Sequence, residues 1–160
     1  MVSGTPVTED VCQVEARKLW NPMAKDSHNL LPKVLPEIFA SVTLLQGDGG
    51  VGTIKQLNFT PANKDFSFVK ERVDEIDEEK MVYKYTTIEG GSLGKKLSAA
   101  SFEVKISPRK EGGCVATWVC NYETLPGGQL DEGRVKEIKE NSVAMLKKIE
   151  QYLLSNPTLY

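Results

Sequence analysis

The stretch from Glu132 to Leu154 carries apolar residues at a spacing close to that of an α-helix. These residues are Val135, Ile138, Met145, Ile149 and Tyr152, and lysines and glutamates occupy the other side. At 1.5 Å per residue, the stretch predicts one amphipathic helix of roughly 34 Å. Asn156-Pro157 supplies a stop signal after it. The apolar face of such a helix has to be buried against another element.

Strand patterns separated by turns fill the chain from residue 39 to residue 122. The expected strands are Phe39–Leu45, Gly52–Phe59, Phe66–Ile76, Met81–Ile88, Ser98–Ile106 and Cys114–Tyr122. In one of them Phe102 and Val104 point one way, whereas Glu103 and Lys105 point the other. One dry face and one wet face are typical of an antiparallel sheet covered on one side. The sequence therefore predicts an α+β fold in which a long helix packs against one long curved sheet.

The segment between the N-terminus and the first of these strands is less regular. Glu15 to Trp20 predicts a short helix. Asn21 to Pro36 contains several prolines, and within it Leu30 to Pro36 predicts at most a short helix broken by its own prolines.

The length and the charge of the chain exclude several classes of protein. A chain of 160 residues fits one domain. Twenty basic against 22 acidic residues give a net charge of −2, which disfavours nucleic-acid binding. No stretch is apolar enough for a membrane helix, and the polar start from Met1 to Asp10 lacks the features of a secretion signal. We therefore expect a cytoplasmic protein without a membrane partner.

The three cysteines and the single histidine indicate no catalytic or metal chemistry. Cys12, Cys114 and Cys120 lack CxxC spacing, which predicts neither a disulfide framework nor a zinc site. His28 follows Asp26 and Ser27 directly in a loop-like stretch, and three successive side chains diverge too much for a catalytic triad. The sequence predicts no catalytic residue, no metal and no cofactor.

A glycine-rich turn lies between two of the expected strands. It consists of Gly47, Asp48, Gly49, Gly50, Val51, Gly52 and Thr53. Backbone amides of such turns can bind phosphate, but a nucleotide loop ends in Gly-Lys-Ser/Thr or leads into a helix. Here Thr53 to Phe59 continues as a strand, which favours a rigid hairpin over a phosphate site.

Aromatic residues recur at strand spacing. Tyr83 and Tyr85 share one face of their strand, and Trp118 and Tyr122 share a face of another. Ordinary core packing would explain this stripe. A partly apolar, wet cavity would explain it too, because buried tyrosine hydroxyls and indole N–H groups need partners. Both interpretations stay open from the residues alone.

Four motifs in order resemble one known family. They are Asn29–Pro36, Gly47–Lys55, Tyr83–Gly91 and Glu150–Leu154. Together they resemble the plant pathogenesis-related class 10 proteins, the birch-pollen major allergen family of the START-like superfamily. The likeness runs over essentially the whole chain.

The resemblance implies a helix-grip fold over residues 1–160. In that fold a seven-stranded curved antiparallel sheet wraps around the long C-terminal helix. Two short helices form a V that supports the helix end, and a large internal cavity lies between sheet and helix. The resemblance also implies a first strand near Pro6 to Val11, which the residue pattern alone does not predict.

The resemblance also implies a ligand site. Its cavity-facing positions are Met23, Leu31, Phe59, Phe66, Val69, Tyr83, Tyr85, Val104, Ala116, Trp118, Tyr122, Asn141, Ser142, Met145 and Leu146. Lys55 matches a family lysine that can donate to a ligand oxygen, although a salt bridge is an equal alternative. His28 falls near the cavity entrance, where many relatives carry an acidic residue, and this departure suggests an altered ligand preference.

Three functions follow from the resemblance. The first is binding of small amphipathic ligands as carrier, store or sensor, by a monomer or weak dimer. Such ligands include phytohormones such as cytokinins and abscisic acid, flavonoids, sterols and other phenolic metabolites. The second is an enzyme of specialised metabolism or a weak ribonuclease, but Ser92 and Thr117 replace the tyrosine and lysine of the condensing relatives. The third is a phosphatase-inhibiting hormone receptor, whose gate loop needs a proline that Gly91–Lys95 lacks.

Overall fold

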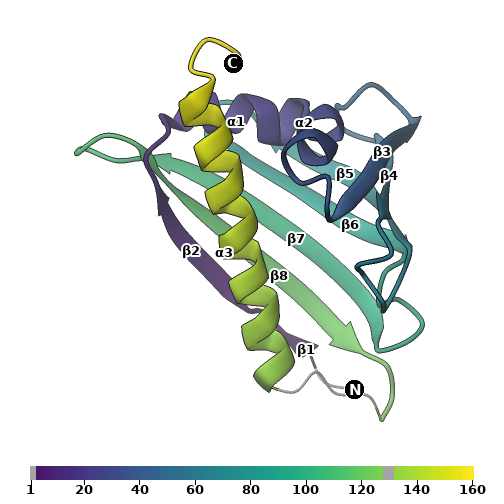
Figure 1. The fold of residues 1–160 in the computed structure, drawn as a ribbon. Helices are drawn as coiled ribbons and strands as arrows, with labels where there is room; N and C mark the ends of the chain where they lie inside the picture. The colour runs from purple at the N-terminus through teal and green to yellow at the C-terminus, as the bar shows by residue number, and fades with distance from the viewer. Residues whose placement is uncertain (1–2, 128–131) are drawn as a thin grey trace.

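A strongly curved antiparallel sheet holds one long helix against its inner side in the computed structural model, which describes residues 3–127 and 132–160 (Figure 1). Met1 and Val2, at the start of the polar N-terminal stretch, lie outside the described residues. The strands are β1 (Ser3–Gly4), β2 (Val7–Cys12), β3 (Phe39–Gln46), β4 (Ile54–Phe59), β5 (Phe68–Asp77), β6 (Val82–Gly90), β7 (Leu97–Pro108) and β8 (Cys114–Thr124). The helices are α1 (Ala16–Trp20), the π-helical η1 (Asn21–Lys25), α2 (Ser27–Val34) and α3 (Glu132–Ser155).

The sheet order is β1-β8-β7-β6-β5-β4-β3, and β2 also pairs with β8. β1 and β2 pair with successive parts of the same neighbour, so they form one strand position that is interrupted at Thr5 and Pro6. Within the described residues, the sheet therefore has seven strand positions. The predicted curved antiparallel sheet, long C-terminal helix and two short N-terminal helices are confirmed.

The expectation that Asn21 to Pro36 is irregular is wrong, because most of this stretch is helical. α1 runs directly into η1, and α2 begins two residues later at Ser27. Pro22 lies in the first turn of η1, where a missing N–H does little harm. Pro32 lies inside α2, which nevertheless continues to Val34. The two short helices pack against their surroundings, and this packing outweighs the local preference of proline.

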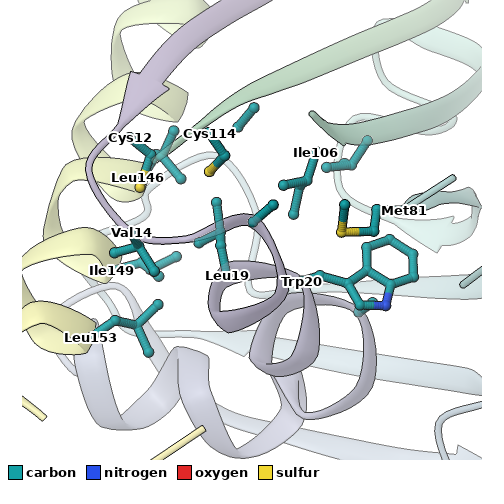
Figure 2. Close-up of a cluster of buried hydrophobic side chains, with 14 of the residues drawn as sticks. Cys12, Val14, Leu19, Trp20, Met81, Ile106, Cys114, Leu146, Ile149 and Leu153 are labelled. Atoms are coloured by element: carbon teal, nitrogen blue, oxygen red, sulfur yellow. The ribbon is translucent and has the colours of Figure 1, made fainter. Parts of the chain in front are cut away.

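In the described part of the chain, two clusters of buried apolar side chains form the core. The larger one lies where α1, β2 and α3 meet and includes the fully buried Leu19, Trp20 and Ile106 (Figure 2). The smaller one gathers around Leu35, Phe39 and Leu57. Members of both clusters also line a pocket between the sheet and α3, so the packed core and the pocket share one continuous apolar surface.

None of the helices in residues 3–127 and 132–160 is long and apolar enough to cross a membrane.

Candidate functional site

A pocket of about 490 Å³ lies between the inner face of the sheet and α3. Strands β2 to β8 and the helices η1, α2 and α3 all contribute to its lining, which is mostly apolar. Known small-molecule sites measure about 300–1,000 Å³ and combine apolar walls with a few polar groups. The pocket has the size and the composition of such a site.

One wall of the pocket is a continuous row of aromatic rings, which we call the aromatic wall. It consists of Tyr83, Tyr85, Phe102 and Trp118, on β6, β7 and β8. Successive ring centroids are 6.0, 4.8 and 5.4 Å apart, and all three pairs are stacked. Alternation along each strand places these rings on the same face of the sheet. The wall offers a flat, polarisable surface to an aromatic or conjugated molecule.

Two polar tips of the aromatic wall are hydrogen-bonded to each other. The indole Nε1 of Trp118 donates a hydrogen bond to the Tyr85 hydroxyl oxygen at 3.2 Å. Both residues also line the pocket. The sequence left two interpretations open, core packing and a cavity. Each describes part of the arrangement, because the rings pack against one another and also line the pocket.

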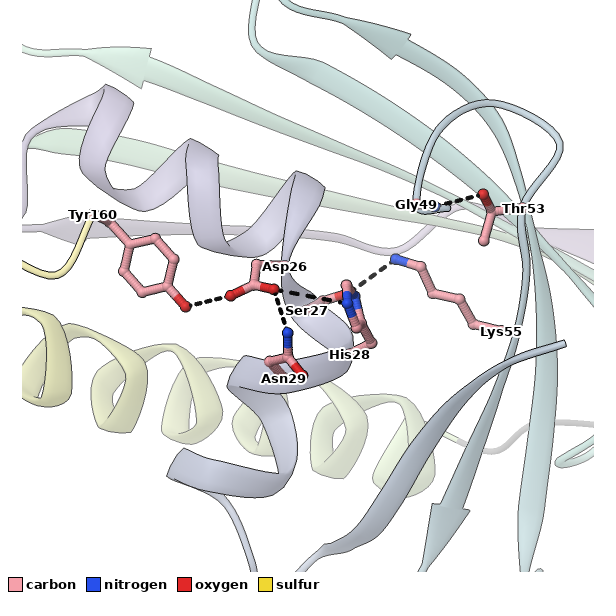
Figure 3. A network of polar contacts seen from close by, with 8 residues as sticks. All are labelled: Asp26, Ser27, His28, Asn29, Gly49, Thr53, Lys55 and Tyr160. Atoms are coloured by element: carbon pink, nitrogen blue, oxygen red, sulfur yellow. Dashed lines mark hydrogen bonds and ion pairs between the residues drawn. The ribbon is translucent and has the colours of Figure 1, made fainter. Parts of the chain in front are cut away.

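Lys55 provides a positive group at the pocket. This side chain on β4 is buried, and its Nζ donates to Ser27 Oγ at 2.8 Å (Figure 3). Its hydrogen-bond partner is thus a neutral hydroxyl on α2 rather than a carboxylate. Burial lowers the pKa of Lys55, and the Glu71 charge partly opposes this effect. One donor position of the ammonium is occupied by Ser27, and the others are open to a ligand.

Glu71 is a pocket residue that the sequence analysis missed. It is the cross-strand partner of Lys55 in the β4–β5 register and lines the pocket between the apolar Val69 and Val73. Burial raises the pKa of Glu71 to about 7, and Lys55 opposes this shift. The inward side of β5 alternates Val69, Glu71, Val73, and this pattern in the sequence could have revealed the carboxylate.

Thr8 and Asp10 on β2 also line the pocket and were not predicted. Lys147 on α3 lies 3.5 Å from Asp10 Oδ2, which links the first long strand to the last helix. The sequence analysis derived β2 only from the family resemblance, so its inward side chains were not considered.

A polar network connects the chain's C-terminal residue to the start of α2 (Figure 3). Tyr160 donates its hydroxyl proton to Asp26 Oδ2 at 2.6 Å, and Asn29 Nδ2 donates to Asp26 Oδ1 at 2.7 Å. Ser27, which accepts the Lys55 hydrogen bond, is the next residue along the chain. The segment that holds Lys55 is therefore itself held by Tyr160.

His28 lies in the first turn of α2, not in a loop. Its Nε2 is 3.8 Å from Asp26 Oδ1, and its Nδ1 is buried without a partner in the described part of the chain. His28 is not among the residues that line the pocket.

The glycine-rich turn forms a tight loop between β3 and β4. The hydroxyl oxygen of the buried Thr53 accepts a hydrogen bond from Gly49 N at 2.9 Å, and Gly52 N donates to Val73 O at 2.8 Å. The turn residues Gly47, Asp48, Gly49, Gly50, Gly52 and Thr53 do not line the pocket. A role for this turn in ligand binding stays a prediction.

The other positions implied by the resemblance come together in space. The pocket lining includes Met23, Leu31, Lys55, Phe59, Phe66, Val69, Tyr83, Tyr85, Val104, Ala116, Trp118, Tyr122, Asn141, Ser142, Met145 and Leu146. The Ser142 hydroxyl donates to Ile138 O at 3.0 Å within α3, so a ligand would meet mainly its oxygen. Whether any of these residues contacts a ligand stays a prediction.

The cysteines are buried free thiols. Cys12 on β2 and Cys114 on β8 are directly opposed in the strand pairing. In the described parts of the chain, no group of three histidine, cysteine, aspartate or glutamate side chains could hold a metal ion.

Comparison with known proteins shows which sequences and folds are similar to this chain. The model of the pathogenesis-related protein Bet v 1 family matches residues 1–156. Pathogenesis-related protein 1 from Asparagus officinalis is 38% identical over 160 residues, which is 100% of this chain and 99% of the relative.

Two solved structures are similar over nearly the whole chain. The crystal structure of Ara h 8.0201 is 28% identical with a TM-score of 0.82, and the match covers 96% of this chain and 99% of that one. Norcoclaurine synthase from Thalictrum flavum, in complex with dopamine and hydroxybenzaldehyde, is 25% identical with a TM-score of 0.77. That match covers 96% of this chain and 88% of the synthase.

The family model covers all but the last four residues, and a curated relative exceeds one third identity over the full length. The resemblance drawn from the four sequence motifs is therefore confirmed. The chain belongs to the pathogenesis-related protein Bet v 1 family.

Proposed function

We propose that this protein binds a small amphipathic ligand in the pocket and carries, stores or senses it without changing it. The observation that carries this proposal is the pocket of about 490 Å³, in which an aromatic wall faces the same space as Lys55 and Glu71. The apolar lining would take the body of the ligand, and the two charged groups would orient its polar end. We further propose that residues 1–160 act as one binding domain, as a monomer in the cytoplasm.

The proposed ligands are phytohormones, flavonoids, sterols or other phenolic metabolites of plant defence. We propose that the pocket residues given above contact them, with His28 and the glycine-rich turn nearby. A relative of the same fold holds dopamine and hydroxybenzaldehyde, which supports a capacity for small aromatic molecules.

Titration of the intrinsic tryptophan fluorescence with such a panel tests the proposal. Trp118 lies in the pocket wall, so an occupant in van der Waals contact with it should change its emission. We expect saturable quenching at micromolar concentrations by at least one class of ligand. Silence across the panel, from protein shown to be folded by circular dichroism, would contradict the proposal.

An enzymatic function is the second candidate, because a synthase is among the similar structures. Ser92 and Thr117 line the pocket at the two positions where the resemblance places a catalytic tyrosine and lysine. Neither hydroxyl can take over the acid–base chemistry of that phenol and that amine. Incubation with dopamine and hydroxybenzaldehyde, followed by mass spectrometry, should therefore yield no condensation product above the protein-free rate.

A further inference from the structure

Glu71 brings a carboxylate into the pocket without a partner to neutralise it. In the described parts of the chain, no hydrogen-bond donor reaches its oxygens and no cation lies within 4.0 Å. Its neighbours on the inward side of β5 are Val69 and Val73. An ionised carboxylate in such surroundings is unfavourable unless another group supplies a donor or a positive charge. The pocket's occupant is the group that can supply it.

Lys55 does not fill this role, although it faces Glu71 across the β4–β5 pairing. Its Nζ is directed to Ser27 Oγ on α2, at 2.8 Å. Asp10 is the third charged side chain in the lining, and it has Lys147 beside it. Among the described residues, the charged groups that line the pocket are thus two carboxylates and one ammonium. Glu71 is the carboxylate with no cation within 4.0 Å, and the Lys55 charge acts on it from a greater distance.

The aromatic wall lies next to Glu71. Tyr85 pairs with Val73, the next inward residue of β5 after Glu71, and all three side chains line the pocket. Burial raises the pKa values of Tyr83 and Tyr85, and the charge of Glu71 adds to this effect. The faces of aromatic rings attract cations, and stacked rings also take up a planar ligand. A carboxylate beside such a wall suits a molecule with an aromatic ring and a positive nitrogen.

We propose that the pocket prefers aromatic amphipathic ligands that carry a protonated nitrogen, and that Glu71 accepts a hydrogen bond from this nitrogen while the aromatic wall takes the ring. The inference rests on the proposed binding function and names the class of ligand. The Lys55 ammonium limits the preference because it repels the positive nitrogen of the ligand. Its hydrogen bond to Ser27 keeps this ammonium away from the Glu71 carboxylate.

Three indole compounds that differ mainly in charge test this proposal by isothermal titration calorimetry. Tryptamine is positive, 3-ethylindole is neutral and indole-3-propionate is negative at pH 7.5. Displacement of the neutral probe N-phenyl-1-naphthylamine reports whether each compound occupies the pocket. With the wild-type protein we expect tryptamine to bind more tightly than both other compounds.

Two substitutions in the pocket should move the affinities in opposite directions. Glu71→Gln keeps the shape but removes the charge, and it should weaken tryptamine binding about tenfold while leaving 3-ethylindole unchanged. Lys55→Met should strengthen tryptamine binding and weaken that of indole-3-propionate. The matched control is Glu75→Gln, an exposed position of the same strand β5 that pairs with Lys84, and it should change nothing.

The pH dependence supplies a second readout. Tryptamine stays positive between pH 6 and pH 8, whereas Glu71 titrates near pH 7. Among the described residues, the charged or titratable groups that interact electrostatically with Glu71 are Lys55 from β4 and Tyr83 and Tyr85 from β6. The pKa values of both tyrosines are raised, so they stay neutral in this range. We expect tryptamine affinity to rise about tenfold from pH 6 to pH 8 in the wild type and to stay flat in Glu71→Gln.

The outcomes separate this inference from the function on which it rests. If the naphthylamine probe binds but tryptamine binds no better than 3-ethylindole, or if Glu71→Gln leaves the order unchanged, the preference for a protonated nitrogen is wrong and the binding function stands. If indole-3-propionate binds most tightly, Lys55 rather than Glu71 selects the ligand. If neither the probe nor any indole binds to folded protein, the proposed function itself fails.

Discussion

Glu71 also has consequences for the stability of the folded protein. Its pKa is raised by burial from 4.5 to about 7. The folded state therefore binds a proton more tightly than the unfolded state. The contribution of the Glu71 carboxyl to the free energy of unfolding is fully present below pH 4.5 and is lost as the pH rises through about 7.

Substitution Glu71→Gln should remove this pH dependence. Urea unfolding should show the variant to be more stable than the wild type at pH 8, by at most roughly 3 kcal/mol. The difference should shrink as the pH falls toward 4.5, because the wild-type carboxyl is then protonated in the folded state and half protonated in the unfolded state. Glu75→Gln, at the exposed Lys84 pair, serves as control. A difference that stays constant from pH 5 to pH 8 would contradict the assigned pKa.

Trp118 and Trp20 differ in what a ligand can do to their emission. Trp118 lines the pocket, whereas Trp20 is fully buried and donates from Nε1 to Glu78 Oε2 at 2.9 Å. We expect Trp118→Phe to abolish most of the fluorescence change on ligand binding and Trp20→Phe to retain it. If the signal follows Trp20 instead, the ligand lies at the other end of the aromatic wall, where Tyr83 is 5.7 Å from the Trp20 ring.

Residue identities in the pocket were predictable where the family resemblance supplied them. Tyr83, Tyr85 and Trp118 fell on inward faces by simple alternation as well. Glu71 was missed because charged residues at strand positions are usually assigned to the wet face, and Asp10 because the residue pattern alone did not predict β2. The inward direction of Glu71 follows only from which alternate positions of its strand carry apolar residues.

At the scale of an element, the glycine-rich turn joins β3 to β4 by a backbone that few residues can adopt. Gly47 has φ +84° and Gly52 has φ +89°. A Cβ atom on Gly47 would lie 2.5 Å from Thr53 Oγ1, whereas one on Gly52 would meet nothing within 4 Å. Both glycines thus need a left-handed backbone, but only Gly52 has room for a Cβ atom.

Alanine at these two positions should separate the two effects. Both variants should lose about 1–2 kcal/mol of unfolding free energy from the left-handed backbone. Gly47→Ala should lose more, by about 1–3 kcal/mol, because its methyl group displaces Thr53 and the hydrogen bond from Gly49. Urea denaturation measures both losses, and equal losses would show that Thr53 moves aside freely.

The strands and α3 were predictable because their apolar periodicity is long and clear. The predicted strand Cys114–Tyr122 and the predicted helix Glu132–Leu154 each differ from the structure by one or two residues at one end. The helices of Asn21 to Pro36 were not predictable in this way, since Pro22 and Pro32 interrupt a stretch too short to show a period. Their helical state depends on packing around Leu19, Trp20 and Leu30, which the local sequence does not express.

At the scale of the whole molecule, residues far apart in the sequence hold the helices to the sheet. Glu150 on α3 is buried, and its Oε2 accepts a hydrogen bond from Gln13 N, just after β2, at 2.6 Å. Lys18 Nζ on α1 donates to Pro157 O at 3.1 Å. The Lys18 bond and the contact of Tyr160 with Asp26 join the segment after α3 to the N-terminal helices.

The bond between Tyr160 and Asp26 predicts a measurable coupling across this junction. Tyr160→Phe keeps the ring that packs against the larger core cluster and removes only the hydroxyl. Asp26→Asn keeps the shape of the acceptor but not its charge. In a double-mutant cycle of urea unfolding, we expect a coupling free energy of about 1 kcal/mol. Tyr160→Phe paired with Asp48→Asn, a carboxylate in the glycine-rich turn, should give none.

Ser27 follows Asp26 directly and holds Lys55, so Tyr160→Phe should also loosen the Lys55 ammonium and broaden its NMR signal. A coupling with an unchanged Lys55 signal would mean that Tyr160 fastens the segment after α3 without reaching the pocket.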